Sequence, residues 1–115
     1  MTPSSSVPTS LGRFEHLVLL ATLHLGRDVY AVPIRAEIER RTGSAPARGA
    51  LYTALARLEA KGLLASSVGE PTAIRGGKAK RYYRLTTTGL TALRNSRAEL
   101  VSAWPGAARL LANTR

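Results

Sequence analysis

The residues best suited to contact another molecule lie in the stretch RGGKAKRYYRLTTTG, residues 75–89. Two glycines stand beside a run of cations there, and two tyrosines follow. No acidic residue occurs between Glu70 and Glu99, an interval that contains Arg75, Lys78, Lys80, Arg81, Arg84, Arg94 and Arg97. A flexible segment with this charge can neutralise phosphates, which favours a polyanion as partner, most simply nucleic acid.

The whole chain is strongly basic. Seventeen lysines and arginines against seven acidic residues give its 115 residues a formal net charge of +10. Arginine dominates these cations, and its planar guanidinium suits bidentate contacts to phosphate and guanine. A solvated basic surface in an arginine-rich proteome is the alternative explanation, and charge alone does not exclude it.

Catalytic and metal-binding chemistry is poorly supported. The only aspartate is Asp28, and the two histidines, His16 and His24, stand eight positions apart rather than at the i, i+4 spacing of a helical metal pair. His24 is expected at a core edge or an interface. The sequence GGK at 76–78 lacks the other residues of a phosphate-binding loop. We therefore expect no enzyme, no metal and no cofactor.

The composition also indicates a compartment. There is no cysteine, which fits a reducing environment. The longest apolar run, residues 17–25, is too short to span a bilayer, and residues 1–12 lack the basic start of a signal peptide. A cytoplasmic protein without a membrane partner is the expectation.

Apolar spacing and turn residues predict the elements that position these side chains. After a tail over residues 1–12, helices are expected at about 13–26, 33–42 and 47–61. Strands follow at 63–68 and 81–85, joined by the glycine-containing loop, and a threonine should cap a last helix that begins near residue 88. Whether residues 105–115 are helical is left open. This order predicts a mainly α protein with a small β-hairpin, a winged helix-turn-helix.

The third predicted helix has an outer face of small side chains. Its inward stripe is Leu51, Leu55 and Leu58, and the opposite face carries Gly49, Thr53, Ala56 and Ala60. Small side chains let a helix backbone approach the floor of a DNA groove, and Tyr52, Arg57 and Arg48 flank this face as candidates for phosphate or base contacts. Alternatives are open for three residues: a core edge for Tyr52, a tight helix entry for Gly49 and a surface pair with Glu59 for Arg57.

Two segments together resemble the PadR-like transcriptional regulators. They are GALYTALARLEAKGLL and RGGKAKRYYRLTTTGLTAL, and the resemblance covers roughly residues 13–104. It implies a dimeric winged-helix DNA-binding protein, usually a repressor. By the same resemblance the third helix enters the major groove, the wing reaches an adjacent minor groove, and the first and last helices build the dimer. Small effectors, often aromatic, would bind near the dimer interface.

These inferences give a set of candidate site residues. The DNA-contacting candidates are Arg48, Gly49, Tyr52, Thr53, Arg57, Arg75, Lys78, Lys80, Arg81 and Tyr82. The dimer-interface candidates are Phe14, Leu17, Leu20, Leu93, Leu100 and Trp104. Of the two wing tyrosines, Tyr83 is expected in the core and Tyr82 on the surface, because side chains alternate along a strand.

The expected partners are double-stranded DNA with a pseudo-palindromic operator, a second copy of the chain, and a small aromatic effector. Residues 13–88 would form the DNA-binding domain and residues 89–115 the dimerisation helix and tail. An alternative function is a winged-helix module that binds a protein partner or RNA. A further one is a ligand sensor whose DNA role is secondary.

Overall fold

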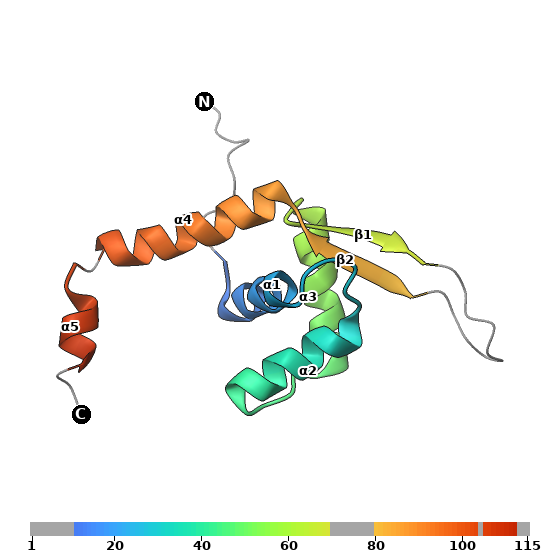
Figure 1. Ribbon diagram of the computed structural model, residues 1–115, viewed down its shortest axis with the longest axis horizontal. Coiled ribbons are helices and arrows are strands. Elements are labelled where there is room, and N and C mark those ends of the chain that lie inside the picture. The colour runs from blue at the N-terminus through green and yellow to red at the C-terminus, as the bar shows by residue number, and fades with distance from the viewer. Residues whose placement is uncertain (1–10, 70–79, 104, 113–115) are drawn as a thin grey trace.

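The computed structural model describes residues 11–69, 80–103 and 105–112, the side chains of residues 100, 101, 107 and 108 excepted. Its elements are α1 (Arg13–Leu25), α2 (Ala31–Thr42), α3 (Arg48–Ala60), β1 (Leu64–Val68), β2 (Arg81–Leu85), α4 (Thr87–Ala103) and α5 (Ala107–Ala112). Helices α1, α2 and α3 form a bundle, and the two strands extend from it on the side opposite to α5 (Figure 1). The predicted order of elements is confirmed, and residues 107–112 are helical.

One apolar core joins the three helices to the strands and to α4. Its fully buried side chains include Leu19 on α1, Ile34 on α2 and the predicted stripe of α3, Leu51, Leu55 and Leu58. Leu63 and Leu64 extend the core to β1, and Ala92 and Leu93 extend it to α4. The apolar spacing of α3 therefore placed its buried face correctly.

The start of α2 differs from the prediction. The helix begins at Ala31, two residues before the expected Pro33, which occupies its third position. A proline is tolerated there because the first N–H groups of a helix have no intrahelical partner. Gly43 ends α2 in the left-handed conformation, with φ +84°, and its N–H donates to the Glu39 carbonyl at 2.8 Å.

The strands β1 and β2 pair antiparallel, and the pairs run from Leu64 with Leu85 to Val68 with Arg81. Val29, in the connection between α1 and α2, adds two backbone hydrogen bonds to the other edge of β2. Its N–H donates to the Tyr83 carbonyl at 3.1 Å, and the Tyr83 N–H donates to the Val29 carbonyl at 2.7 Å. The pairing of Val29 with Tyr83 ties the hairpin to the helices, and it was not predicted from the sequence.

Tyr83 is buried, as expected, and burial raises the pKa of its phenol, with the nearby Arg81 acting in the opposite direction. Tyr82 is half-buried rather than exposed. Its ring packs edge-to-face against Tyr30, with centroids 5.9 Å apart and an interplanar angle of 80°. The alternation of the strand placed Tyr83 correctly, but the neighbouring Tyr30 covers part of Tyr82.

A threonine caps α4, as predicted. The Thr86 hydroxyl donates to the Gly62 carbonyl at 2.7 Å and accepts from the Gly89 N–H at 2.9 Å. Gly89 lies against the backbone of Leu63, and a Cβ at this position would collide with the Leu63 carbonyl oxygen. Only glycine lets α4 pass so close to the start of β1.

The expected tail, residues 1–12, lies mostly outside the described residues. Leu11 packs against the core, and Gly12 precedes α1 as its N-cap, so these two residues belong to the folded unit. Within the described part of the chain, no helix combines the length and the apolar character needed to cross a membrane.

Candidate nucleic-acid interface

The outer face of α3 is open to solvent along its length. Arg48, Gly49, Thr53 and Arg57 are exposed, and Tyr52 is 53% exposed. The side chains between them, Leu51, Ala54, Leu55 and Leu58, are buried. The helix therefore presents all five predicted contact residues to solvent, and the exposure of Tyr52 argues against the alternative of a core edge.

Nothing among the described residues requires a glycine at position 49. A Cβ added there would meet no atom within 4 Å, and its φ is not in the left-handed region. The alternative of a tight helix entry therefore gains no support from its surroundings. A missing side chain on an exposed face favours close approach by another molecule, because glycine otherwise weakens a helix.

The cations of α3 are available for contacts. Within the residues that the structure describes, the side chains of Arg48 and Arg57 form no ion pair. Glu59, the alternative partner of Arg57, instead accepts a hydrogen bond from the Ser66 hydroxyl at 2.6 Å. The surface pair considered for Arg57 is therefore absent, and its guanidinium can bind an anion.

A hollow of about 620 Å³ separates the start of α1 from α3, and Arg13, Thr53, Arg57 and Lys61 are among the residues that line it. Lys61 is held by Glu15 at 2.9 Å, whereas Arg13 is exposed. Sequence reasoning did not select Arg13. Arg13 becomes a candidate only in the folded chain. There α1 and α3 bring Arg13 and Arg57 to one hollow, although the two residues are far apart in the sequence.

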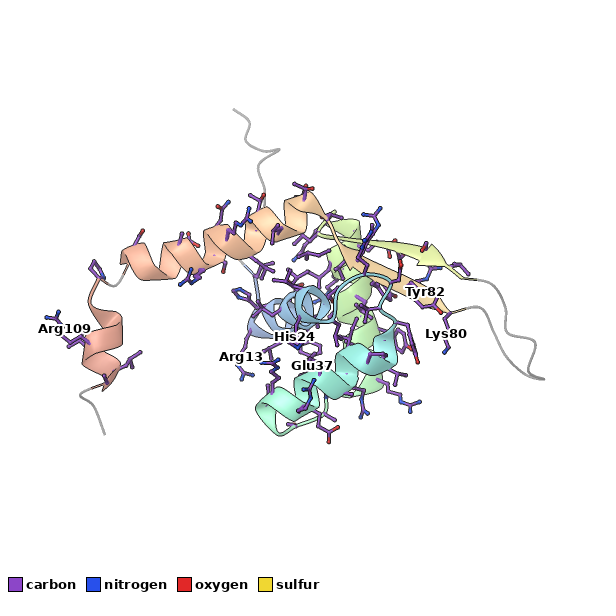
Figure 2. The ribbon with its side chains drawn as sticks, in the orientation of Figure 1. Arg13, His24, Glu37, Lys80, Tyr82 and Arg109 are labelled. Atoms are coloured by element: carbon purple, nitrogen blue, oxygen red, sulfur yellow. The ribbon has the colours of Figure 1, made fainter. Side chains whose placement is uncertain are left out.

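The loop end of the hairpin carries two further candidate cations. Lys80 lies over the ring of Tyr30, with its Nζ 4.1 Å from the ring centroid. Arg81 donates through Nη1 to the Ser66 hydroxyl at 3.0 Å, and Ser66 in turn binds Glu59 on α3. Figure 2 shows Lys80 and Tyr82 together at the start of β2, at the loop end of the hairpin. Arg75 and Lys78 lie outside the described residues.

The dimer-interface candidates fall into three groups. Leu20 is 46% exposed, and it shares an exposed apolar face on α1 with Leu23, which is also 46% exposed and was not selected. Phe14 and Leu17 are half-buried against the core, and Leu93 is already buried within the chain. The side chain of Leu100 and all of Trp104 lie outside the described part. Among the described candidates, Leu20 thus has the largest exposed fraction left for a partner.

An open hollow of about 430 Å³ lies between α1 and α2. Leu17, Leu20, Leu23 and Ile38 give it apolar walls, and Glu37 closes one side. The Glu37 carboxylate is buried, forms ion pairs with Arg40 and with Arg41, the latter at 2.6 Å, and lies 3.6 Å from His24 Nε2 (Figure 2). Sequence reasoning missed this buried acid, although arginines at i+3 and i+4 were a usable signal.

His24 is exposed and lies beside this hollow, 3.1 Å from an Arg41 guanidinium nitrogen through Nε2. It lies at the edge of the pair formed by α1 and α2, and an interface role for it stays a prediction. No group of three or more metal-ligating side chains forms among the described residues. The charged groups around Glu37 are a compact ion-pair network at the edge of the hollow.

Comparison with known proteins identifies the arrangement. The family model described as "Transcriptional regulator PadR-like family" matches residues 19–95. No curated protein matches. Among solved structures, a PadR family transcriptional regulator from Eggerthella lenta is 29% identical with a TM-score of 0.65, over 89% of this chain and 87% of that one.

Two further structures agree. A PadR family regulator from Clostridium difficile is 26% identical with a TM-score of 0.66, over 87% of this chain and 99% of that one. A transcriptional regulator from Clostridium thermocellum is 27% identical with a TM-score of 0.64, over 77% of this chain and 83% of that one. Members of this family are transcriptional regulators and not enzymes. The chain belongs to the PadR-like family of winged-helix, DNA-binding transcriptional regulators.

Proposed function

We propose that the protein is a homodimeric repressor that binds a pseudo-palindromic operator and is released by a small aromatic effector. Helix α3 enters the major groove of each half-site, and the wing contacts the adjacent minor groove. The two α3 helices of the dimer then lie about one helical turn of DNA, roughly 34 Å, apart. Residues 13–88 form the DNA-binding domain, and residues 89–115 serve dimerisation.

The observation that carries this proposal is the exposed face of α3. It combines a bare backbone position at Gly49, a hydroxyl and methyl at Thr53, and the unpaired guanidinium groups of Arg48 and Arg57 within the described residues. Thr53 can contact a thymine methyl, and an arginine can bind guanine or phosphate. A helix that enters a DNA groove needs an exposed face of this kind, with charged side chains that are not already ion-paired.

Dimerisation is supported by the exposed leucines of α1 and by the course of α4. Leu20 and Leu23 leave apolar surface uncovered, and α4 runs from the wing side of the bundle to the opposite end of the molecule (Figure 1). A helix that extends so far from its own core can pack against a second copy. Both α1 and α4 were expected at the interface from the family resemblance.

The effector proposal rests on the hollow between α1 and α2. Its volume of about 430 Å³ and its leucine walls suit a small apolar ligand. A ligand that binds beside the dimer face shifts the population of dimer geometries and so the separation of the two wings. Titration of planar aromatic compounds, followed by the fluorescence of the single tryptophan, Trp104, tests this step.

The repressor proposal is tested by binding to the DNA upstream of its own gene, compared with random duplex at two salt concentrations. We expect tighter binding to the upstream DNA and an affinity that falls steeply with salt. An Arg48→Ala, Arg57→Ala double variant should lose most of this preference. Equal binding to both duplexes would contradict sequence-specific regulation. A monomer that ignores duplex DNA would instead favour a module that binds protein or RNA.

A further inference from the structure

Four residues from three segments meet at the loop end of the hairpin. Tyr30 precedes α2 as its N-cap, Gly69 follows β1, and Lys80 and Tyr82 lie at the start of β2. The Tyr30 ring contacts Tyr82 edge-to-face at 5.9 Å between centroids, and Lys80 Nζ lies 4.1 Å from the centroid of the same ring. We call these four residues the Tyr30 cluster.

The cluster is closely packed. A Cβ at Gly69 would lie 2.6 Å from the Tyr82 ring, so the ring already fills the space beside this glycine. The Gly69 N–H donates to the Lys80 carbonyl at 2.8 Å and continues the hairpin ladder beyond β1. Tyr82 is thus held between Gly69, just after β1, and Tyr30, just before α2.

The backbone beside Tyr30 fixes the same junction. Val29, the preceding residue, exchanges both backbone hydrogen bonds with Tyr83, at 2.7 and 3.1 Å. On the other side, α2 is joined to the start of α3 by Arg35, whose Nε donates to the Pro46 carbonyl at 2.6 Å. A series of contacts therefore runs from the wing through Val29, Tyr30 and α2 to Pro46, two residues before α3.

We propose that Tyr30 is a positioning residue for DNA binding, which sets the wing and its cation Lys80 relative to α3. This inference rests on the proposed DNA-binding function and deepens it. Tyr30 itself need not touch DNA. Its aromatic face holds the ammonium of Lys80, and its edge-to-face contact holds Tyr82, so the wing reaches the duplex already oriented.

These contacts would reduce the conformational entropy that the wing loses when it binds DNA. A hairpin attached only by its two strands must lose conformational freedom when it binds, and that loss reduces affinity. Contacts that order the wing in the free protein remove part of this cost. They leave the number of neutralised phosphates unchanged, so their removal should lower affinity at every salt concentration by a similar factor.

The test compares Tyr30→Ala and Tyr30→Phe in the full chain, with the upstream duplex as probe. We expect Tyr30→Ala to weaken binding about fivefold to tenfold without changing the slope of log affinity against log salt. Tyr30→Phe, which keeps the ring, should bind as the wild type does. Lys80→Gln should weaken binding and also make the salt slope shallower, because it removes a cation.

A double-mutant cycle separates positioning from a general decrease in stability. In the Lys80→Gln background, Tyr30→Ala should cost less affinity than in the wild type, because part of its effect acts through Lys80. An equal cost in both backgrounds would overturn the proposal, as would wild-type affinity in a folded Tyr30→Ala protein. If Tyr30→Ala does not fold, Tyr30→Leu serves instead, since leucine fills space without an aromatic face.

Proton NMR of the free protein examines the cluster without DNA. The side-chain methylene protons of Lys80 should be shifted upfield by the Tyr30 ring, and Tyr30→Leu should abolish this shift while Tyr30→Phe retains it. Unshifted Lys80 protons in the wild type would contradict the contact itself. A wild-type protein that shows the shift but binds no duplex would overturn the DNA-binding function, and with it the positioning role, while leaving the cluster intact.

Discussion

Gly49 is the residue whose conformational and binding roles are easiest to separate. Its Cβ position is open and its backbone needs no glycine, so Gly49→Ala should stabilise α3, by about 0.5 kcal/mol. The added methyl lies on the face proposed to meet DNA, and it should weaken binding by about 1 kcal/mol, roughly fivefold. Thermal unfolding and fluorescence anisotropy measure the two effects. Unchanged affinity in the variant would remove Gly49 from the interface.

Gly89 has the opposite character, because the chain itself requires glycine there. An alanine methyl would collide with the Leu63 carbonyl oxygen and lie 2.8 Å from Leu85 Cδ1. We expect Gly89→Ala to lower the free energy of unfolding by about 2 kcal/mol, a typical cost of overpacking. Gly49→Ala is the matched control, since Gly49 also lies within a helix and its Cβ would meet no described atom within 4 Å. Equal denaturation midpoints for both variants would contradict this account.

At the scale of single residues, the sequence predicted burial and exposure correctly where the spacing along one helix determines them. The 100° spacing along α3 separated the buried Leu51, Leu55 and Leu58 from the exposed candidates. Sequence reasoning failed where two distant segments meet. Tyr30 and Arg13 acquire their roles from β2 and α3, which approach them only in the folded chain. No local pattern could have selected them.

At the scale of elements, the wing is linked to α3 by side chains as well as by the core. Arg81 binds Ser66, and Ser66 binds Glu59, so the first cation of β2 is oriented from α3. Arg81 is itself exposed, which leaves its remaining donors free to meet a phosphate. The same residue can therefore position the wing and contribute charge to DNA binding.

Removal of this cation should change the salt dependence of binding. We expect Arg81→Ala to weaken binding to specific and random duplex alike, and to make the salt slope shallower by about 0.9 for each phosphate that is no longer neutralised. Arg109→Ala is the control, because it removes an equal charge on α5, at the end of the molecule opposite the wing (Figure 2). An unchanged slope in Arg81→Ala would exclude a phosphate role for this residue.

The elements themselves were largely predictable because each has its own apolar stripe and its own terminating residue. Gly26 and Gly43 follow α1 and α2, and Thr86 caps α4, as expected from residue types alone. The start of α2 was misplaced because proline suits any position in a first helical turn, not only the first. The contact of Val29 with β2 was missed because a single paired residue leaves no alternating pattern.

At the scale of the whole molecule, the central question is whether the exposed face of α1 joins two copies. Leu20 and Leu23 are each 46% exposed, beside a hollow with further apolar walls. Exposed leucines at neighbouring positions favour an interface over a solvated surface. A dimer would also bring twice as many cations to one operator. Each chain has a formal net charge of +10, so the second copy adds to the attraction for DNA.

We therefore expect a Leu20→Ser, Leu23→Ser variant to sediment as a monomer at concentrations where the wild type is a dimer. Because both side chains are half in solvent already, the fold should tolerate the change, and circular dichroism should match the wild type. Affinity for the full operator should fall at least tenfold, while affinity for a single half-site should barely change, since α3 and the wing are untouched. Val32→Ser is the matched control, because Val32 is 61% exposed on α2 outside this face. If the double variant remains dimeric and binds the full operator normally, α4 and the residues after it must hold the two copies together without α1.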